Sequence, residues 1–154
     1  MTGTYVALEY NQRVRLSFPG TSFDSAVNST SDTSQRAARS LELALAAADT
    51  AEENEGRNIV VLDLRSVSPL FDYFVIASGT SRRQMHAMSE EIDHKLEDDL
   101  GDRRMSIEGY QDSRWILLDY GNIVVHLLDD EAREYYDLES LWAEATVVER
   151  PTAK

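Results

Sequence analysis

A length of 154 residues suits one domain with a buried core, and 42% hydrophobic with 28% charged residues is typical of a globular protein. The absence of cysteine excludes disulfides, thiolate metal sites and cysteine nucleophiles, and no apolar run reaches the roughly 18 residues that cross a bilayer. The N-terminus also lacks the features of a secretory signal, so we expect a cytoplasmic protein without membrane contact. The formal net charge of -13 opposes direct nucleic-acid binding but permits docking on a basic protein.

The first 35 residues differ in composition from the remainder. Eight of the fifteen residues from Thr21 to Gln35 are Ser or Thr, which leaves too little apolar area to offset the entropy of ordering. We therefore expect a flexible extension over residues 1–35, a folded domain over residues 36–147 and a C-terminal tail over residues 148–154.

A helix and two strands are expected next along the chain. The helix begins after Ser34, because apolar residues recur at i, i+3, i+4 and i+7 on one face: Leu41, Ala44, Leu45 and Ala48. The β-branched run "NIVVLDL" (residues 58–64) predicts a buried strand, and "FDYFVIA" (residues 71–77) predicts a second one.

A second helix is expected after the turn "SGTS" (residues 78–81). Ser81 and Gln84 have the spacing of a capping box, and Gly101 ends the helix. One face of this helix is apolar, and it carries Met85, Met88, Ile92 and Leu96.

Three strands and two short helices complete the expected order. The strands lie in "RRMSIEGY" (residues 103–110) and in a hairpin around residues 121–122, and the helices lie in residues 129–136 and 137–145, each with an Asp available as N-cap. The order α-β-β-α-β-β-β-α predicts the α/β class with α+β character, in which helices flank a single mixed sheet of about five strands.

The hairpin between residues 115 and 128 has two different faces. Gly121-Asn122 is a two-residue turn signal that fixes the register, so side chains alternate between the faces. One face is almost purely apolar and is expected to face the core: Ile116, Leu118, Tyr120, Ile123, Val125 and Leu127. The other face is mixed: Trp115, Leu117, Asp119, Val124, His126 and Leu128.

The mixed face has two interpretations. It is an open platform for a protein partner, with Trp115 as an aromatic anchor of the kind on which binding energy concentrates. In the alternative, helices cover both faces of the sheet, and Asp119 and His126 satisfy each other in the core.

Patterns that indicate catalysis or metal binding are weak in this sequence. His86, Glu90 and His94 share a helix face without the His-Glu-x-x-His spacing of a zinc site, so a solvated polar stripe is the better interpretation and no metal is expected. The turn "ASGTSRRQ" (residues 77–84) has neither phosphate-binding fingerprint, and we interpret it as a cap and turn. Paired strand carboxylates and a nucleophile with its base are lacking as well, so we expect neither an enzyme nor a cofactor.

Several motifs in fixed order resemble the Iojap family of ribosomal silencing factors. They are "DYFVI", the Gly-Thr-Ser turn with Arg82, "EGY", "WILLDYG", "VVH" and "YYDLESLW", and together they span roughly residues 38–145. The resemblance implies a nucleotidyltransferase-like fold without known catalytic activity. It also implies that the protein binds ribosomal protein L-fourteen on the large subunit, sterically blocks joining of the small subunit when nutrients are scarce, and forms homodimers off the ribosome.

The resemblance further implies a contact surface on this chain. Its residues centre on the hairpin and are bordered by the last helices: Trp115, Leu117, Asp119, Tyr120, Gly121, His126, Tyr136, Leu138 and Trp142. Asn122 stands where an acidic residue is common, and Phe71 stands where a small one is usual. Two alternative functions stay open, namely assembly of the large subunit and, with less support, a nucleotidyltransferase-like enzyme that uses the turn at Gly79 to Ser81.

Overall fold

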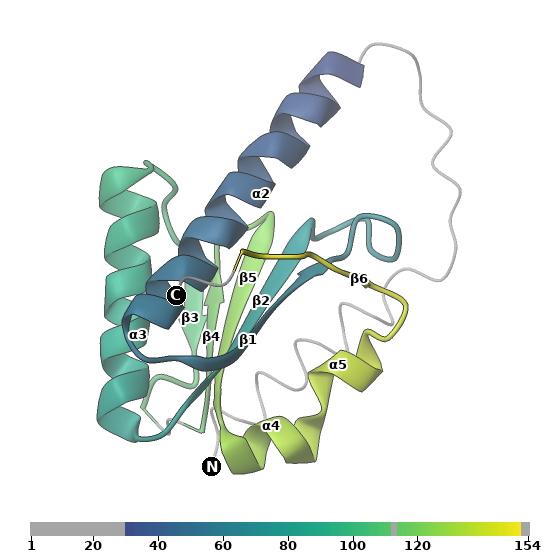
Figure 1. Ribbon diagram of the computed structural model, residues 1–154. Coiled ribbons are helices and arrows are strands. Elements are labelled where there is room, and N and C mark those ends of the chain that lie inside the picture. Colours follow the sequence, from purple (N-terminus) through teal and green to yellow (C-terminus); the bar gives the residue numbers. More distant parts are fainter. Residues whose placement is uncertain (1–29, 112–113, 152–154) are drawn as a thin grey trace.

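The computed structural model describes residues 30–111 and 114–151, and these form one mixed sheet with helices on both faces (Figure 1). The elements in chain order are α2 (Thr30–Glu53), β1 (Arg57–Asp63), β2 (Tyr73–Gly79), α3 (Arg82–His94), the π-helical turn η1 (Lys95–Asp99), β3 (Ser106–Glu108), β4 (Trp115–Asp119), β5 (Ile123–Asp129), α4 (Asp130–Tyr136), α5 (Leu138–Leu141) and β6 (Thr146–Val147). The strand order is β3-β4-β5-β2-β1-β6, with β2 and β5 parallel and all other neighbours antiparallel. This arrangement confirms the predicted fold class.

Helix α2 begins at Thr30, inside the segment expected to be flexible. Its buried stripe consists mainly of small residues, which let the helix lie close to the sheet: Ser40, Leu43, Ala44, Ala47, Ala48 and Ala51. Leu41 and Leu45 of the predicted apolar face are only half-buried. The predicted face is therefore confirmed at Ala44 and Ala48, and Leu41 packs partly buried against the same core cluster.

Helix α3 follows the sequence prediction closely. The backbone N–H of Gln84 donates to the Ser81 hydroxyl (3.1 Å), which caps the helix. All four predicted apolar residues are buried against the sheet: Met85, Met88, Ile92 and Leu96. The chain leaves η1 at Gly101, which has the left-handed φ of +71° that glycine tolerates best.

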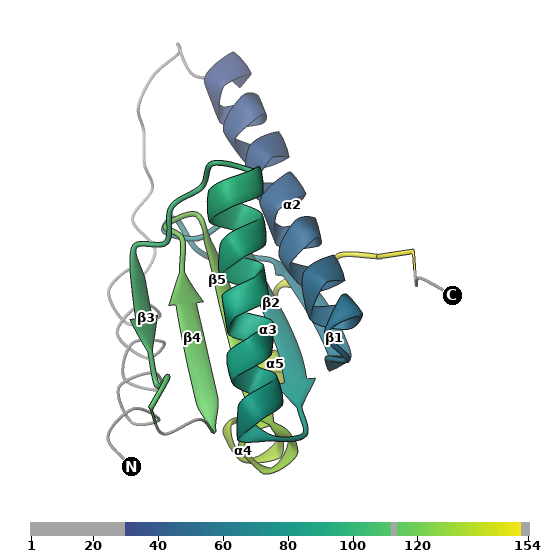
Figure 2. The same cartoon turned by 90° about the vertical axis from the view of Figure 1, so that its left-hand side faces the viewer.

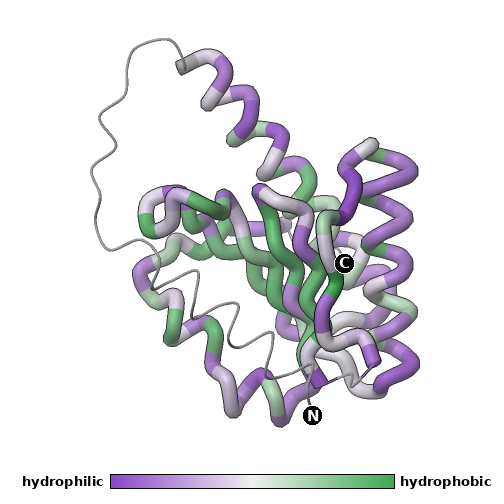
Figure 3. Tube along the Cα trace, turned by 180° about the vertical axis from the view of Figure 1, so that it is seen from behind, coloured by the Kyte–Doolittle hydropathy of each residue, from purple (hydrophilic) through white to green (hydrophobic). Residues whose placement is uncertain are grey.

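The hairpin has the predicted register, with Trp115 opposite Leu128 and Leu117 opposite His126. Gly121 has a φ of +91° in the turn, as a type II′ turn requires at its first central position. The apolar face of the hairpin belongs to the core cluster that also contains the buried residues of α2 and α3. Coloured by hydropathy, the central strands are apolar and the helices carry many hydrophilic residues (Figure 3).

The segment after α5 differs from the expected tail. β6, which the sequence analysis did not predict, pairs with the end of β1. The backbone N–H of Val148 then donates to the Val61 carbonyl (2.8 Å), and Arg150 forms ion pairs with Asp49 (2.8 Å) and Glu52 (3.1 Å) of α2. Residues 148–151 are thus packed against the domain; the rest of the expected tail, and residues 1–29 of the expected extension, lie outside the described residues.

Candidate functional site: the hairpin and the helices after it

Trp115 and His126 meet on adjacent strands, as the predicted register requires. The indole Nε1–H donates to His126 Nδ1 across 3.1 Å, and neither side chain has any exposed surface. Nδ1 is therefore the acceptor nitrogen of a neutral ring, so the proton lies on Nε2, for which the described part of the chain offers no hydrogen-bond partner. Phe74 contacts the same ring nearly edge-on, with ring centroids 4.6 Å apart.

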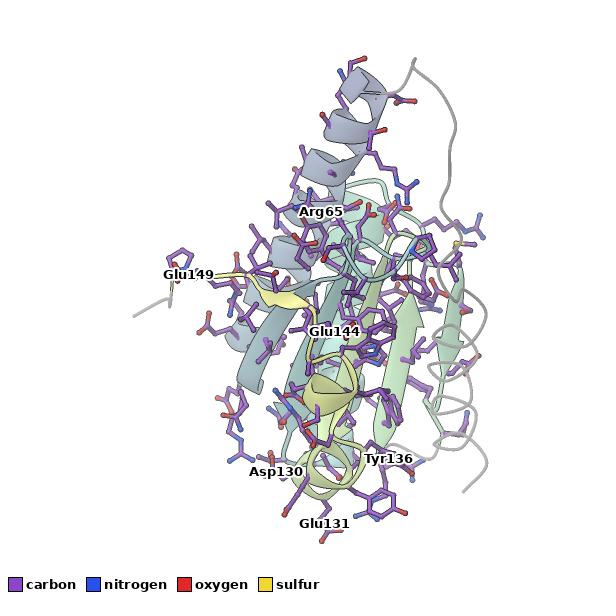
Figure 4. All side chains as sticks on the ribbon, turned by 90° about the vertical axis from the view of Figure 1, so that its right-hand side faces the viewer. Arg65, Asp130, Glu131, Tyr136, Glu144 and Glu149 are labelled. Atoms are coloured by element: carbon purple, nitrogen blue, oxygen red, sulfur yellow. The ribbon has the colours of Figure 1, made fainter. Side chains whose placement is uncertain are left out.

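The prediction that this face is open to a partner is wrong for Trp115. The indole packs on Tyr136 of α4 (ring centroids 4.9 Å apart) and belongs to a second apolar cluster with Leu138 and Trp142. Helices α4 and α5 lie on this side of the sheet, opposite α2 and α3 (Figures 1 and 4). At Trp115 the alternative interpretation is correct: helices cover both faces of the sheet.

The polar side chains of the hairpin have other hydrogen-bond partners than the sequence predicted. Asp119 and His126 do not satisfy each other: Asp119 Oδ1 accepts the backbone N–H of Gly121 (2.7 Å), and the carboxylate is 8% exposed. Tyr120 points into the first cluster, as the alternation predicted, and its hydroxyl donates to Asp93 (2.9 Å). A direct partner contact through the Tyr120 ring, which the resemblance implied, conflicts with an exposure of only 5%.

A second carboxylate lies beside Asp119. Glu108 of β3 pairs with Leu117, and its buried Oε2 atom has no hydrogen-bond partner among the described residues. Burial, and then the negative charge of Asp119, raises the pKa of Glu108. Two carboxylates, those of Glu108 and Asp119, therefore lie close together on this face, and Glu108 was not among the predicted site residues.

Helix α4 presents the exposed part of this region. Tyr135 is 81% exposed, and its ring stands perpendicular to that of Tyr136 with centroids 4.9 Å apart. Contacting rings thus run from the surface at Tyr135 through Tyr136 to Trp115 in the core. Tyr135 was not among the predicted contact residues, although the "YY" pair of the family motif contains it.

The surface around Tyr135 is acidic. Figure 4 shows Asp130, Glu131 and Tyr136 on α4 and Glu144 after α5. Asp130 and Glu131 form ion pairs with arginines from other elements. The remaining exposed acids in this part of the described chain have no Lys or Arg within 4.0 Å: Glu134, Asp137 and Glu144. This surface suits a basic partner.

The turn before α3 is held by hydrogen bonds to a side chain of α3 itself. Gln84 Oε1 accepts the backbone N–H (2.6 Å) and the hydroxyl (2.7 Å) of Thr80, so these two donors of the turn are not available to a phosphate. The predicted cap-and-turn role of Ser81 is confirmed. In a full capping box the Gln84 side chain would also bind the backbone N–H of the cap residue, Ser81. Here it binds the backbone N–H of Thr80 instead.

The polar residues of α3 have separate partners. His86 Nε2 contacts the Tyr110 carbonyl (2.7 Å), the Tyr110 hydroxyl donates to Glu90 (2.7 Å), and His94 pairs with Asp98 (2.5 Å). Within residues 30–111 and 114–151, the structure brings together no His, Asp and Glu cluster that fits a metal ion. The same residues include no helix that is long and apolar enough to cross a membrane.

Burial of His126 predicts a pH-dependent stability. It lowers the pKa of this imidazole from 6.5 to about 3, so only the unfolded chain takes up the proton between these values. The contribution of neutral His126 to the free energy of unfolding is therefore fully present above pH 6.5, and it decreases as the pH falls toward 3. Proton linkage then predicts that the free energy of unfolding is about 2 kcal/mol lower at pH 5 than at pH 7. Urea denaturation at pH 7 and pH 5 measures this loss, and His126→Gln should show a smaller one; equal losses in the two proteins would contradict the assignment.

Comparisons with known proteins identify the family. The family described as "Ribosomal silencing factor during starvation" matches residues 37–154. The chain is 36% identical over 109 residues to ribosomal silencing factor RsfS of Bacillus subtilis, covering 71% of this chain and 89% of that protein. It is 39% identical over 93 residues to mouse "Mitochondrial assembly of ribosomal large subunit protein 1", covering 58% of this chain and 40% of that protein.

A solved structure agrees with this assignment. The crystal structure of a Chromobacterium violaceum protein superimposes with a TM-score of 0.64 at 31% identity, covering 73% of this chain and 89% of that one. The matched region contains the hairpin, α4 and α5, in which the aromatic and acidic residues described above are placed. This chain belongs to the RsfS family of ribosomal silencing factors.

Proposed function

We propose that this chain represses translation by docking on the large ribosomal subunit through ribosomal protein L-fourteen and sterically blocking the small subunit. Family membership supports the ribosomal role, and the acidic α4–α5 surface around exposed Tyr135 is the observation that supports docking on a basic protein. Occupancy of the binding site on the large subunit is enough to produce this effect, so no catalytic group, cofactor or metal is required. The protein acts in the cytoplasm, where bacterial ribosomes are.

The structure changes how the predicted contact residues take part in this proposal. Tyr135 and Tyr136 on α4 form the aromatic contact, and the neighbouring acids surround it. Trp115, Leu117, His126, Leu138 and Trp142 support this surface from the core, because each is buried. Asp119 and Gly121 shape the hairpin turn, which lies at the other end of β5 from α4.

A subunit-joining assay tests the proposed mechanism. Added protein should co-sediment with purified bacterial large subunits and reduce the yield of complete ribosomes in proportion to occupancy. Association should slow as salt rises, because the acidic surface steers the protein toward a basic partner. Co-sedimentation without reduced joining would contradict the blocking mechanism.

A role in large-subunit assembly is the second candidate, and the name of the mouse relative favours it. Ribosome profiles of a deletion strain separate the two functions. Assembly precursors that accumulate during growth would indicate the second function. Normal subunits with excess translation during starvation would indicate silencing. Homodimer formation off the ribosome stays a prediction, and sedimentation of the free protein tests it.

A further inference from the structure

Arg82 and Arg83 are exceptional among the basic residues of this acidic chain. Every other Lys and Arg within the described residues has a carboxylate oxygen within 4.0 Å. Among the described residues, neither Arg82 nor Arg83 has one, and the two are neighbours in sequence and both exposed. The guanidinium of Arg82 donates to the Gln111 carbonyl, a neutral acceptor, and no carboxylate of residues 30–111 and 114–151 forms an ion pair with it.

The location of these two arginines is unfavourable for stability. They are the first two residues of α3, and the first turn of this helix contains no acidic residue. The helix dipole places partial positive charge at that end, so cations there oppose it. A local arrangement that disfavours folding indicates a use other than stability.

The two side chains line an open hollow of about 520 Å³ on the surface of α3, together with His86, Ala87 and Glu90. One wall is held in place by a stack of His86 on Tyr110, with ring centroids 4.1 Å apart and planes at 8°. Glu90, the acid in this lining, accepts the Tyr110 hydroxyl (2.7 Å) and is not paired with either arginine. The hollow therefore presents two uncompensated cations to an approaching anion.

We propose that Arg82 and Arg83 contact the phosphate backbone of ribosomal RNA while the α4 surface docks on a ribosomal protein. Guanidinium groups match phosphate oxygens in geometry and charge. Gly79 pairs with Asp129 in the parallel β2–β5 ladder, so α3 and α4 begin at the same end of the sheet, on its two opposite faces (Figure 2). A particle that contacts α4 therefore also approaches Arg82 and Arg83.

This contact rests on the proposed function. A chain with a net charge of -13 is repelled by free RNA. Docking of α4 on a protein overcomes this repulsion, because it holds the two arginines at high local concentration beside the RNA. We therefore expect no measurable affinity for isolated RNA and a clear contribution on the intact subunit.

The test compares two double variants on purified bacterial large subunits. Arg82→Ala with Arg83→Ala should raise the Kd roughly tenfold and reduce the slope of log Kd against log salt by about 1–2, the value for one or two lost phosphate contacts. The control, Arg36→Ala with Arg103→Ala, also removes two exposed positive charges, one of them on a side chain that is 89% exposed, and should leave the slope unchanged. The first variant should melt no lower than the wild type, because it removes charges that oppose the dipole of α3.

A site-specific crosslink identifies what faces the hollow. The chain has no cysteine, so Ala87→Cys provides a single attachment point for a photoreactive maleimide beside both arginines. Crosslinks to ribosomal RNA support the proposal, and crosslinks only to protein overturn it. Unchanged Kd and salt slope in the Arg82 and Arg83 variant also overturn it while the proposed function stands. A wild type that fails to co-sediment overturns the proposed function and this contact with it.

Discussion

Replacing Trp115 by alanine is expected to lower the free energy of unfolding by about 3–5 kcal/mol, the usual cost of truncating a buried tryptophan. The indole has no exposed surface, contacts Tyr136 of α4 and donates to His126, so its removal leaves a cavity and an unpaired acceptor. Urea denaturation measures the loss, and Trp142 stays available as the fluorescent probe because the chain has two tryptophans.

Trp115→Phe is the matched control for this prediction. It keeps an aromatic ring in the same place and removes only part of the volume and the hydrogen bond to His126, so it should cost clearly less than alanine. An alanine variant with an unchanged urea midpoint would show that the indole is not a core residue. That result would restore the interpretation of Trp115 as an exposed anchor.

Replacing Tyr135 by alanine should weaken binding to large subunits by about 2–4 kcal/mol, which is roughly 30- to 1000-fold in Kd. Tyr135 is 81% exposed and contacts Tyr136 edge-on, so it combines a large apolar surface with a fixed orientation. For the same reason the urea midpoint should change little. Co-sedimentation across a range of subunit concentrations measures the change in Kd.

Two further variants define what Tyr135 contributes. Tyr135→Phe separates the ring from the hydroxyl and should keep most of the affinity if the ring is the anchor. Met105→Ala removes another exposed apolar side chain, 74% exposed, before β3 and distant from α4 in sequence, and should bind normally. Equal binding by wild type and Tyr135→Ala would remove α4 from the proposed contact surface.

Much of the fold was predictable because its signals are local. The Gly121-Asn122 turn and the alternation of side chains predicted the register that brings Trp115 to His126. The cap at Ser81 and the spacing of Met85 and Met88 predicted α3. Each of these signals depends on residues a few positions apart or on one two-residue turn, so a sequence contains all of the required information.

Which helices cover the mixed face of the hairpin was not predictable from such local signals. Both faces of β4 and β5 are rich in apolar residues, and periodicity describes the faces without saying what packs on them. The wrong prediction at Trp115 came from this gap: α4 and α5 place Tyr136, Leu138 and Trp142 around the indole, and only their path over the sheet decides that. β6 and the Arg150 ion pairs depend in the same way on residues far apart in the chain.

Most of the elements, the hairpin register, the acidic character and the family motifs follow from the sequence alone, because these are properties of short segments and of composition. The tertiary structure alone decided which aromatic residues are buried and which are exposed, because burial depends on how distant elements pack. It therefore moved the proposed anchor from Trp115 to Tyr135. It also showed that Arg82 and Arg83 lack the carboxylate partners that the other described basic residues have, since ion pairing too depends on proximity in space.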